Sequence, residues 1–181
     1  MAITITGNQV NNNAGRMILN QSAGILAVSH SKTTATTQAQ TTTPFTALEV
    51  GITPQSSSST FLVLACLFGW SGDDSVSYLE YSTNGGGSWT KDTTMNGQGT
   101  FGGIGDHSWS HRSNQGPMGN TIMVNWSPGT TGNCRVRLRP SSENNGAGGF
   151  WLNSAAMPTT AGGDYNSGSA ISSLTLFEIA G

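Results

Sequence analysis

The sequence is poor in charged side chains. Only 9% of its 181 residues are Asp, Glu, Lys or Arg, against about 25% in ordinary soluble domains, so hydroxyl and amide groups must solvate the surface. The formal net charge is −2, and no basic patch of the kind that neutralises phosphates is present. We therefore expect no nucleic-acid partner. We also expect protein contacts to depend on shape and apolar burial, which salt screens little.

Cysteine and membrane-directing segments are scarce as well. The two cysteines, Cys66 and Cys134, lie in predicted strands rather than in spaced loops, so free thiols are expected. A disulfide would need Cα atoms within about 7 Å of each other. No apolar run reaches about 18 residues, and the first residues lack a basic segment followed by an apolar one. We expect neither a membrane span nor a signal peptide.

A sustained apolar period of 3.6 residues is absent, whereas short alternating runs recur between clusters of Gly, Asn, Ser and Pro. This pattern predicts an all-β fold with almost no helix, as a sandwich or barrel. The length suits one domain, 24–181, preceded by a short extended arm, 1–23. The predicted strands are 2–6, 16–19, 24–30, 44–53, 60–69, 75–82, 88–93, 107–111, 120–126, 133–139, 149–153 and 170–179.

The N-terminal arm is rich in asparagine and glycine and would be disordered in isolation. We expect it to be held by its own sheet, a neighbouring subunit or another protein. The residues predicted to make this contact are Ile3, Ile5, Val10 and Arg16. Further along, the threonine-rich stretch 31–43 is compatible with a loop or an edge strand, and its composition favours the loop.

Two predicted strands are apolar on both faces. The run 61–68 lacks polar alternation, and in 174–179 apolar residues point to both sides. An antiparallel sandwich buries one face of a strand, so another subunit or covering loops must bury the second face. We expect an oligomer. The predicted interface residues are Phe61, Val63, Leu67, His107, Trp109, His111, Phe177 and Ile179.

Two segments carry a resemblance to a known family. Ile52-Thr53-Pro54-Gln55 and four serines lead into the apolar strand 61–68, and the sequence ends on ISSLTLFEIAG. This combination resembles a group of bacteriophage virion proteins found as tail-fibre tips and capsid decoration subunits. The resemblance spans roughly Gly24 to Gly181 and is sharp in those two segments. It implies a trimeric antiparallel jelly roll, a β-sandwich like that of tumour necrosis factor.

The stretch 133–139 alternates cleanly and predicts a strand with one wet face. Its three arginines could bind a phosphate or a carboxylate-rich partner, although a solvated or interface-pairing face is the simpler interpretation. The inward residues are predicted to be Cys134, Val136 and Leu138, and the outward residues Arg135, Arg137 and Arg139.

Residues 82–89, STNGGGSW, match the Asp-box pattern S-x-D-x-G-x-[ST]-W, except that Asn84 replaces the aspartate. The motif occurs once, which argues against a propeller, where it recurs in each blade. We predict a β-hairpin in which Asn84 bonds the backbone, glycines permit positive φ and a tryptophan folds over the turn. The predicted turn residues are Ser82, Asn84, Gly86 and Trp89.

His107 and His111 have a spacing that binds zinc on a helix. On a strand the two imidazoles share a face but stand about 13 Å apart, too far for one ion. We expect these side chains, with Trp109, to contact a partner or an oligomer axis, or to pack ordinarily. The pair Asp73-Asp74 lacks the other ligands of a calcium loop, so we expect no metal or other cofactor.

No nucleophile motif or paired carboxylates are recognisable, and we expect no enzymatic activity. We expect a phage virion structural protein, a homotrimeric capsid decoration (cement) protein. It would be made in the host cytoplasm and bind the major capsid protein on the capsid surface. One alternative is a tail-fibre or receptor-binding tip that recognises a host glycan. Another is a free carbohydrate-binding module, whose tryptophans stack on sugars and which should be a monomer.

Overall fold

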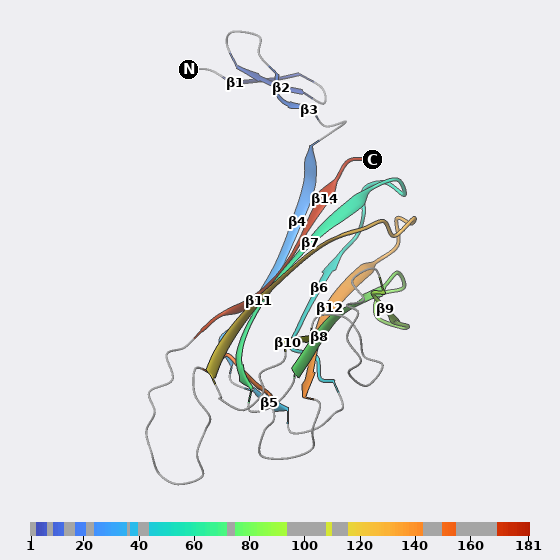
Figure 1. Ribbon diagram of the computed structural model, residues 1–181. Coiled ribbons are helices and arrows are strands. Elements are labelled where there is room, and N and C mark those ends of the chain that lie inside the picture. Colours follow the sequence, from blue (N-terminus) through green and yellow to red (C-terminus); the bar gives the residue numbers. More distant parts are fainter. Residues whose placement is uncertain are drawn as a thin grey trace.

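The computed structural model is all-β in the part of the chain that it describes, as predicted, and no helix long and apolar enough to cross a membrane occurs there. Its strands form a small N-terminal sheet and a two-sheet antiparallel sandwich (Figure 1). The described residues are 3–6, 9–12, 17–20, 24–35, 37–39, 44–71, 75–93, 108–109, 116–142, 150–154 and 170–181.

The N-terminal sheet replaces the extended arm that the sequence predicted. β1 (Ile3–Thr6), β2 (Gln9–Asn12) and β3 (Met17–Asn20) form an antiparallel meander, with Ile5 opposite Val10. Pairing within the segment satisfies backbone N–H and C=O groups that an extended arm would leave to solvent. Among the described strands, none of these three pairs with the sandwich.

One sheet of the sandwich, called here the β7 sheet, is built around β7 (Thr60–Ser71). One edge of β7 pairs along its whole length with β11 (Gly116–Trp126). The other edge pairs first with β14 (Ser172–Ile179), which in turn pairs with β4 (Ile25–Thr33). The last residues of β7 pair instead with β13 (Phe150–Leu152), and β5 (Thr37–Ala39) joins β13.

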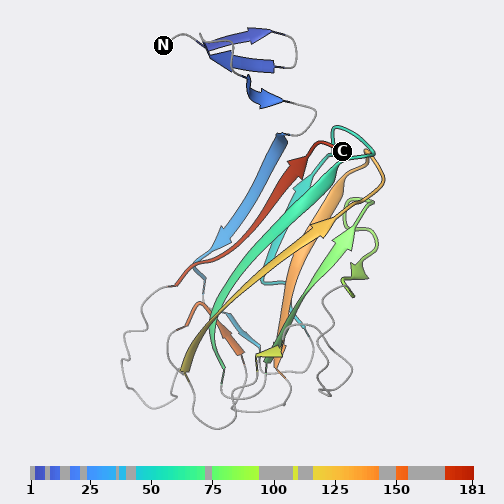
Figure 2. The same ribbon diagram turned by 45° about the horizontal axis from the view of Figure 1, so that its top comes forward.

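The second sheet, called here the β12 sheet, has β12 (Cys134–Ser142) between β6 (Leu48–Ile52) and β8 (Ser75–Ser82). Two short strands, β9 (Thr90–Lys91) and β10 (Ser108–Trp109), also pair with β8. In chain order, the long strands β6, β7, β8, β11, β12 and β14 alternate between the two sheets (Figure 2). Segments far apart in the sequence are therefore neighbours in space.

The core lies between the two sheets and takes every second side chain of each long strand. On β12, the three side chains predicted to point inward, Cys134, Val136 and Leu138, have no exposed surface. The apolar cluster consists of Leu48, Val50, Phe61, Val63, Ala65, Leu67, Leu79, Ile122, Val124, Val136, Leu138, Phe150, Leu152, Leu174 and Leu176.

Trp126 of β11 connects the two sheets. Its ring stacks on Tyr81 of β8, with 4.7 Å between centroids and 14° between planes, and lies 5.7 Å from the ring of Phe61. The Tyr81 hydroxyl donates to Asp92 Oδ2 at 2.8 Å. Burial, together with this bond to a carboxylate, raises the pKa of Tyr81 far above its usual range. The phenol therefore stays neutral inside the aromatic stack.

The two segments that carry the family resemblance meet in the fold. β14 pairs with β7, and Glu178 of β14 is fully buried. Glu178 Oε1 accepts from the backbone N–H of Gln55 at 2.6 Å and from the hydroxyl of Ser59 at 2.7 Å. The Ser58 hydroxyl donates to the Gly181 carbonyl at 3.1 Å. The serine-rich loop and the last strand are thus one structural unit.

Each predicted strand corresponds to an observed one, with boundaries shifted by a few residues. Two observed strands were not predicted. β2 lies in the asparagine-rich segment, and β5 lies in the threonine-rich stretch for which a loop was favoured. Both are short, so their own residues carry little alternation, and both form against partners that a local pattern does not reveal.

Candidate subunit interface

The outer face of the β7 sheet, turned away from the core, is the candidate site. Its first row crosses all four main strands: Val28 on β4, Phe177 on β14, Leu62 on β7 and Asn125 on β11 are directly paired neighbours. Alternation along each strand points these side chains outward, since the residues between them are in the core. Three of the four side chains in this row are apolar.

The next row along the strands has the same orientation. His30, Thr175, Leu64 and Met123 are paired neighbours, and His30 Nδ1 lies 2.8 Å from Thr175 Oγ1. Rows further out add more apolar side chains from strand ends. We call the following set the outer apolar face: Ile25, Val28, Leu62, Leu64, Phe68, Met123, Phe177 and Ile179.

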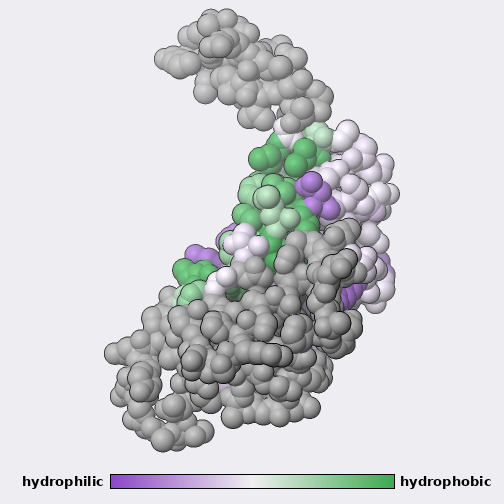
Figure 3. Space-filling model, viewed as in Figure 1, coloured by the Kyte–Doolittle hydropathy of each residue, from purple (hydrophilic) through white to green (hydrophobic). Residues whose placement is uncertain are grey.

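Exposure distinguishes this face from an ordinary protein surface. Ile25 is 55% exposed, Val28 54% and Met123 64%, and Figure 3 shows hydrophobic residues gathered over β4, β14 and β7. Four strands about 4.8 Å apart and roughly eight residues long, at about 3.3 Å per residue, cover about 500 Å². That footprint includes polar positions of the face, such as His30, Thr175 and Asn125, so its apolar part is smaller.

Charge is almost absent from the same face. Of the outward strand positions that the structure describes, Lys32 on β4 is the charged one, and no carboxylate accompanies it. A face of this kind loses little electrostatic solvation when it is covered, so burial of its apolar area dominates the free energy of contact. The arrangement suits a permanent protein contact.

The structure corrects part of the predicted interface. Phe177 and Ile179 lie on the outer apolar face. Phe61, Val63 and Leu67 do not, because they are 0%, 0% and 2% exposed within one subunit and have no surface left to bury. The run 61–68 of β7 lacks polar alternation, so its sequence does not mark which face is buried in the core. These three predicted interface residues lie on the core face.

The other sequence-predicted residues are not brought together here. Trp109 belongs to β10, which pairs with β8 in the β12 sheet, and His107 and His111 lie outside the described residues. The members that the prediction missed were Ile25, Val28, Leu62, Leu64, Phe68 and Met123. A signal for Met123 was available, since Ile122-Met123-Val124 is apolar on both faces of its strand.

The residues predicted to bind a capsid lie in the N-terminal sheet. Ile3 and Ile5 are in β1 and Val10 is in β2, while Arg16 is outside the described residues. Their strands pair with one another rather than extending as a free arm. A contact of this sheet with a capsid is therefore part of the proposal below.

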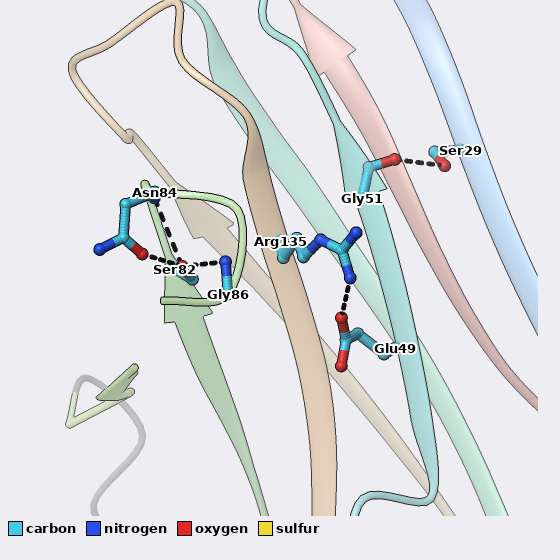
Figure 4. A network of polar contacts seen from close by, with 7 residues as sticks. All are labelled: Ser29, Glu49, Gly51, Ser82, Asn84, Gly86 and Arg135. Atoms are coloured by element: carbon cyan, nitrogen blue, oxygen red, sulfur yellow. Dashed lines mark hydrogen bonds and ion pairs between the residues drawn. The ribbon is translucent and has the colours of Figure 1, made fainter. Parts of the chain in front are cut away.

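The Asp-box-like hairpin is present between β8 and β9. Ser82 Oγ donates to Asn84 Oδ1 and accepts from the Gly86 N–H, both at 2.8 Å (Figure 4). Asn84 Oδ1 also accepts from the Ser88 N–H at 2.9 Å. Gly86 has a φ of 97°, which disfavours any side chain. The Trp89 ring lies against Gly86. These hydrogen bonds all join residues within 82–88, so they stabilise the turn locally.

A buried polar network closes the opposite end of the sandwich. Asn153 Nδ2 donates to the carbonyls of Thr33 and Ala35 at 3.0 and 2.9 Å. Asn153 Oδ1 accepts from the Ser172 hydroxyl at 2.7 Å, and Ser172 Oγ accepts from the Phe68 N–H at 3.0 Å. These contacts fasten the ends of β4, β7, β13 and β14 together.

Both cysteines are free thiols. Burial, and secondarily the carboxylate of Glu178, raises the pKa of the Cys134 thiol, which keeps it protonated and unreactive. Cys66 is half-buried and lies 3.8 Å from Thr121 Oγ1. Within the described ranges, no group of three or more His, Cys, Asp or Glu side chains could hold a metal ion.

No family model matches the chain, and no curated protein matches it. The functional proposal therefore rests on the geometry of the molecule and on the resemblance carried by its two segments.

Proposed function

We propose that the protein is a phage virion structural protein, a homotrimeric decoration (cement) subunit of the capsid, with the outer apolar face buried between subunits. The observation that carries the proposed subunit contact is that face, a sheet surface of about 500 Å² on which apolar side chains gather and charge is almost absent. A standard protein interface buries about 800 Å² per partner, so residues beyond this face must complete the contact.

The fold supports the resemblance that motivates the virion assignment. The alternation of long strands between two sheets is the pattern of a jelly roll. The two sharpest segments of the resemblance are joined through Glu178 and the serine-rich loop. The resemblance selects a trimer among the closed rings that would cover the face.

The mechanism is stabilisation by mass action. A subunit that binds the assembled shell, and not its dissociated parts, lowers the free energy of the assembled state by an amount that grows with its concentration. The N-terminal sheet, with Ile3, Ile5 and Val10, supplies the contact with the major capsid protein. A trimer multiplies this contact, because three linked weak sites bind more tightly than one.

The subunit contact is tested by light scattering coupled to size exclusion. The native chain should elute with the mass of a trimer. Met123→Glu and Val28→Glu each place a charge among apolar side chains and should give folded monomers. Both residues are more than half exposed in one subunit, so neither change should unfold it. Thr90→Glu, at an exposed position of β9, is the matched control and should stay trimeric. A native chain that is monomeric would contradict the proposal.

The role on the capsid is tested separately. Purified trimer is mixed with heads that lack it, and bound protein is measured by sedimentation together with the heat resistance of the heads. Saturation at many copies per head, with increased resistance, is the expected result. Trimer that leaves heads unbound but is found at a few copies per virion would assign the protein to a tail fibre instead.

A further inference from the structure

The outer face of the β12 sheet differs from that of the β7 sheet because it is charged. Arg135 Nη1 pairs with Glu49 at 2.5 Å, and Arg137 Nε pairs with Glu80 at 2.5 Å. Arg139 Nε lies 3.7 Å from the same Glu80 carboxylate. Three guanidinium groups thus share two carboxylates, so this ladder of ion pairs carries one excess positive charge.

Arg135 is the member of the ladder that is open to solvent. Its side chain is 42% exposed, against 20% for Arg137 and 19% for Arg139. The Arg137 guanidinium lies over the Trp89 ring, 4.0 Å from its centroid. A guanidinium has five N–H donors. In the described part of the chain Arg135 uses Nη1 on Glu49, and its Nε is buried without an acceptor.

A groove of about 410 Å³ lies beside this guanidinium. Its size falls within the range of about 300–1,000 Å³ that is typical of small-molecule sites. The walls are mainly polar, with one hydroxyl and one carboxamide side chain next to the arginine. The lining residues are Gly51, Ile52, Thr53, Asn133 and Arg135.

Two glycines leave room for the stem of this arginine. A Cβ added at Gly51 of β6 would lie 3.5 Å from Arg135 Cγ, and one added at Gly86 of the hairpin would lie 3.5 Å from Arg135 Cδ. The arginine stem therefore runs between β6 and the hairpin turn, as Figure 4 shows, and 42% of the side chain stays exposed.

We propose that this groove binds an acidic sugar, whose carboxylate pairs with the guanidinium of Arg135. Because Nη1 pairs with Glu49 and Nε is buried, Nη2 is the group of Arg135 that can bind a ligand. A carboxylate is a strong acceptor for such a charged donor. The Thr53 hydroxyl and the Asn133 amide suit sugar hydroxyls. An acidic peptide fits less well, because protein contacts rely on large apolar anchors that this groove lacks. The site is on the opposite sheet from the subunit interface, so trimer formation leaves it at the surface.

The test is titration of the native trimer with N-acetylneuraminic acid and glucuronic acid, followed by amide shifts in NMR spectra. Both acids should bind weakly, with Kd values of about 1 mM, and neutral glucose should produce no shifts at the same concentrations. Arg135→Gln should weaken binding about 10-fold or more, since a hydrogen bond to a charged group is lost. Arg139→Gln removes the same charge from the same strand outside the groove and should have little effect.

A second variant keeps the charge and narrows the space. Gly51→Ala should narrow the groove and weaken binding while the protein stays folded, because the added Cβ would make only ordinary contacts of 3.5 Å or more. Equal binding of acidic and neutral sugars, or equal losses in Arg135→Gln and Arg139→Gln, would overturn the proposal. So would no binding of either acid, or a glutamate-rich peptide that binds this groove more tightly than the sugars do.

Discussion

Asn153 illustrates what single residues contribute to this fold. It has a φ of 56°, a left-handed conformation that asparagine tolerates better than most residues. Its side chain forms hydrogen bonds with Thr33, Ala35 and Ser172. Its carbonyl partners are 120 and 118 residues away in the sequence. The sequence offers no local pattern for such a network, so this role could not be predicted.

Asn153→Ala should lower the free energy of unfolding by about 2–4 kcal/mol, because the buried Ser172 hydroxyl loses its acceptor, two carbonyls lose their donor and alanine disfavours the backbone conformation. Asn153→Gly loses the same bonds but accepts the backbone, and should cost roughly 1 kcal/mol less. Urea unfolding of both variants measures the difference. Equal stability of native protein and Asn153→Ala would show that the network contributes nothing.

The raised pKa of Tyr81 predicts that the protein loses stability at alkaline pH. Its pKa is raised in the folded state, so above its usual value of about 10 the unfolded chain ionises while the folded protein keeps its proton. The unfolded state then binds fewer protons, and the free energy of unfolding falls by about 1.4 kcal/mol per pH unit. Below that pH the contribution is fully present. In Tyr81→Phe this part of the decline should disappear in urea unfolding between about pH 10 and 11. An unchanged slope would contradict the argument.

At the scale of elements, local chemistry was predictable and the choice of strand face was not. The hairpin between β8 and β9 could be predicted because its bonds join residues within one short turn. β7 could be predicted as a strand apolar on both sides, but Phe61 and Leu62 are equally apolar, and the packing of β14 and the β12 sheet decides which one is inside. That information is not in the strand itself.

Asn84→Asp restores the aspartate of the Asp-box pattern and should change the free energy of unfolding by less than about 0.5 kcal/mol. The carboxylate can accept from the same Ser88 N–H, and the Ser88 hydroxyl, which now accepts from Asn84 Nδ2 at 2.9 Å, can turn to donate. Asn84→Ala removes these bonds and should cost about 1–2 kcal/mol. Thermal unfolding of the two variants is the measurement. A large loss in Asn84→Asp would mean that the amide donor is indispensable.

At the scale of the whole molecule, the two outer faces of the sandwich differ in chemistry. One carries apolar side chains with almost no charge, and the other carries a ladder of arginines and glutamates. Composition predicted an all-β protein with few charges, and two-sided apolar strands predicted an oligomer. Which side chains lie together on each outer face depends on the register of the strands, which the sequence pattern does not specify.

This difference predicts that the proposed trimer is insensitive to salt. Its mass, measured by light scattering, should not change when salt is raised from about 0.1 M to about 1 M, because apolar burial is not screened while the Debye length falls from about 10 Å to about 3 Å. Dissociation at high salt would show that charged groups hold the subunits together and that the outer apolar face is not their main contact.

The stack of Tyr81 on Trp126 also provides a spectroscopic signal for the packing of the two sheets. The two rings belong to different sheets and lie 4.7 Å apart, nearly parallel, close enough for their electronic transitions to couple. Such coupling gives a near-ultraviolet circular dichroism band that exists while the sheets remain closed on each other. The band would vanish if the layers separated with their strands intact, so it distinguishes opening of the sandwich from melting of its sheets.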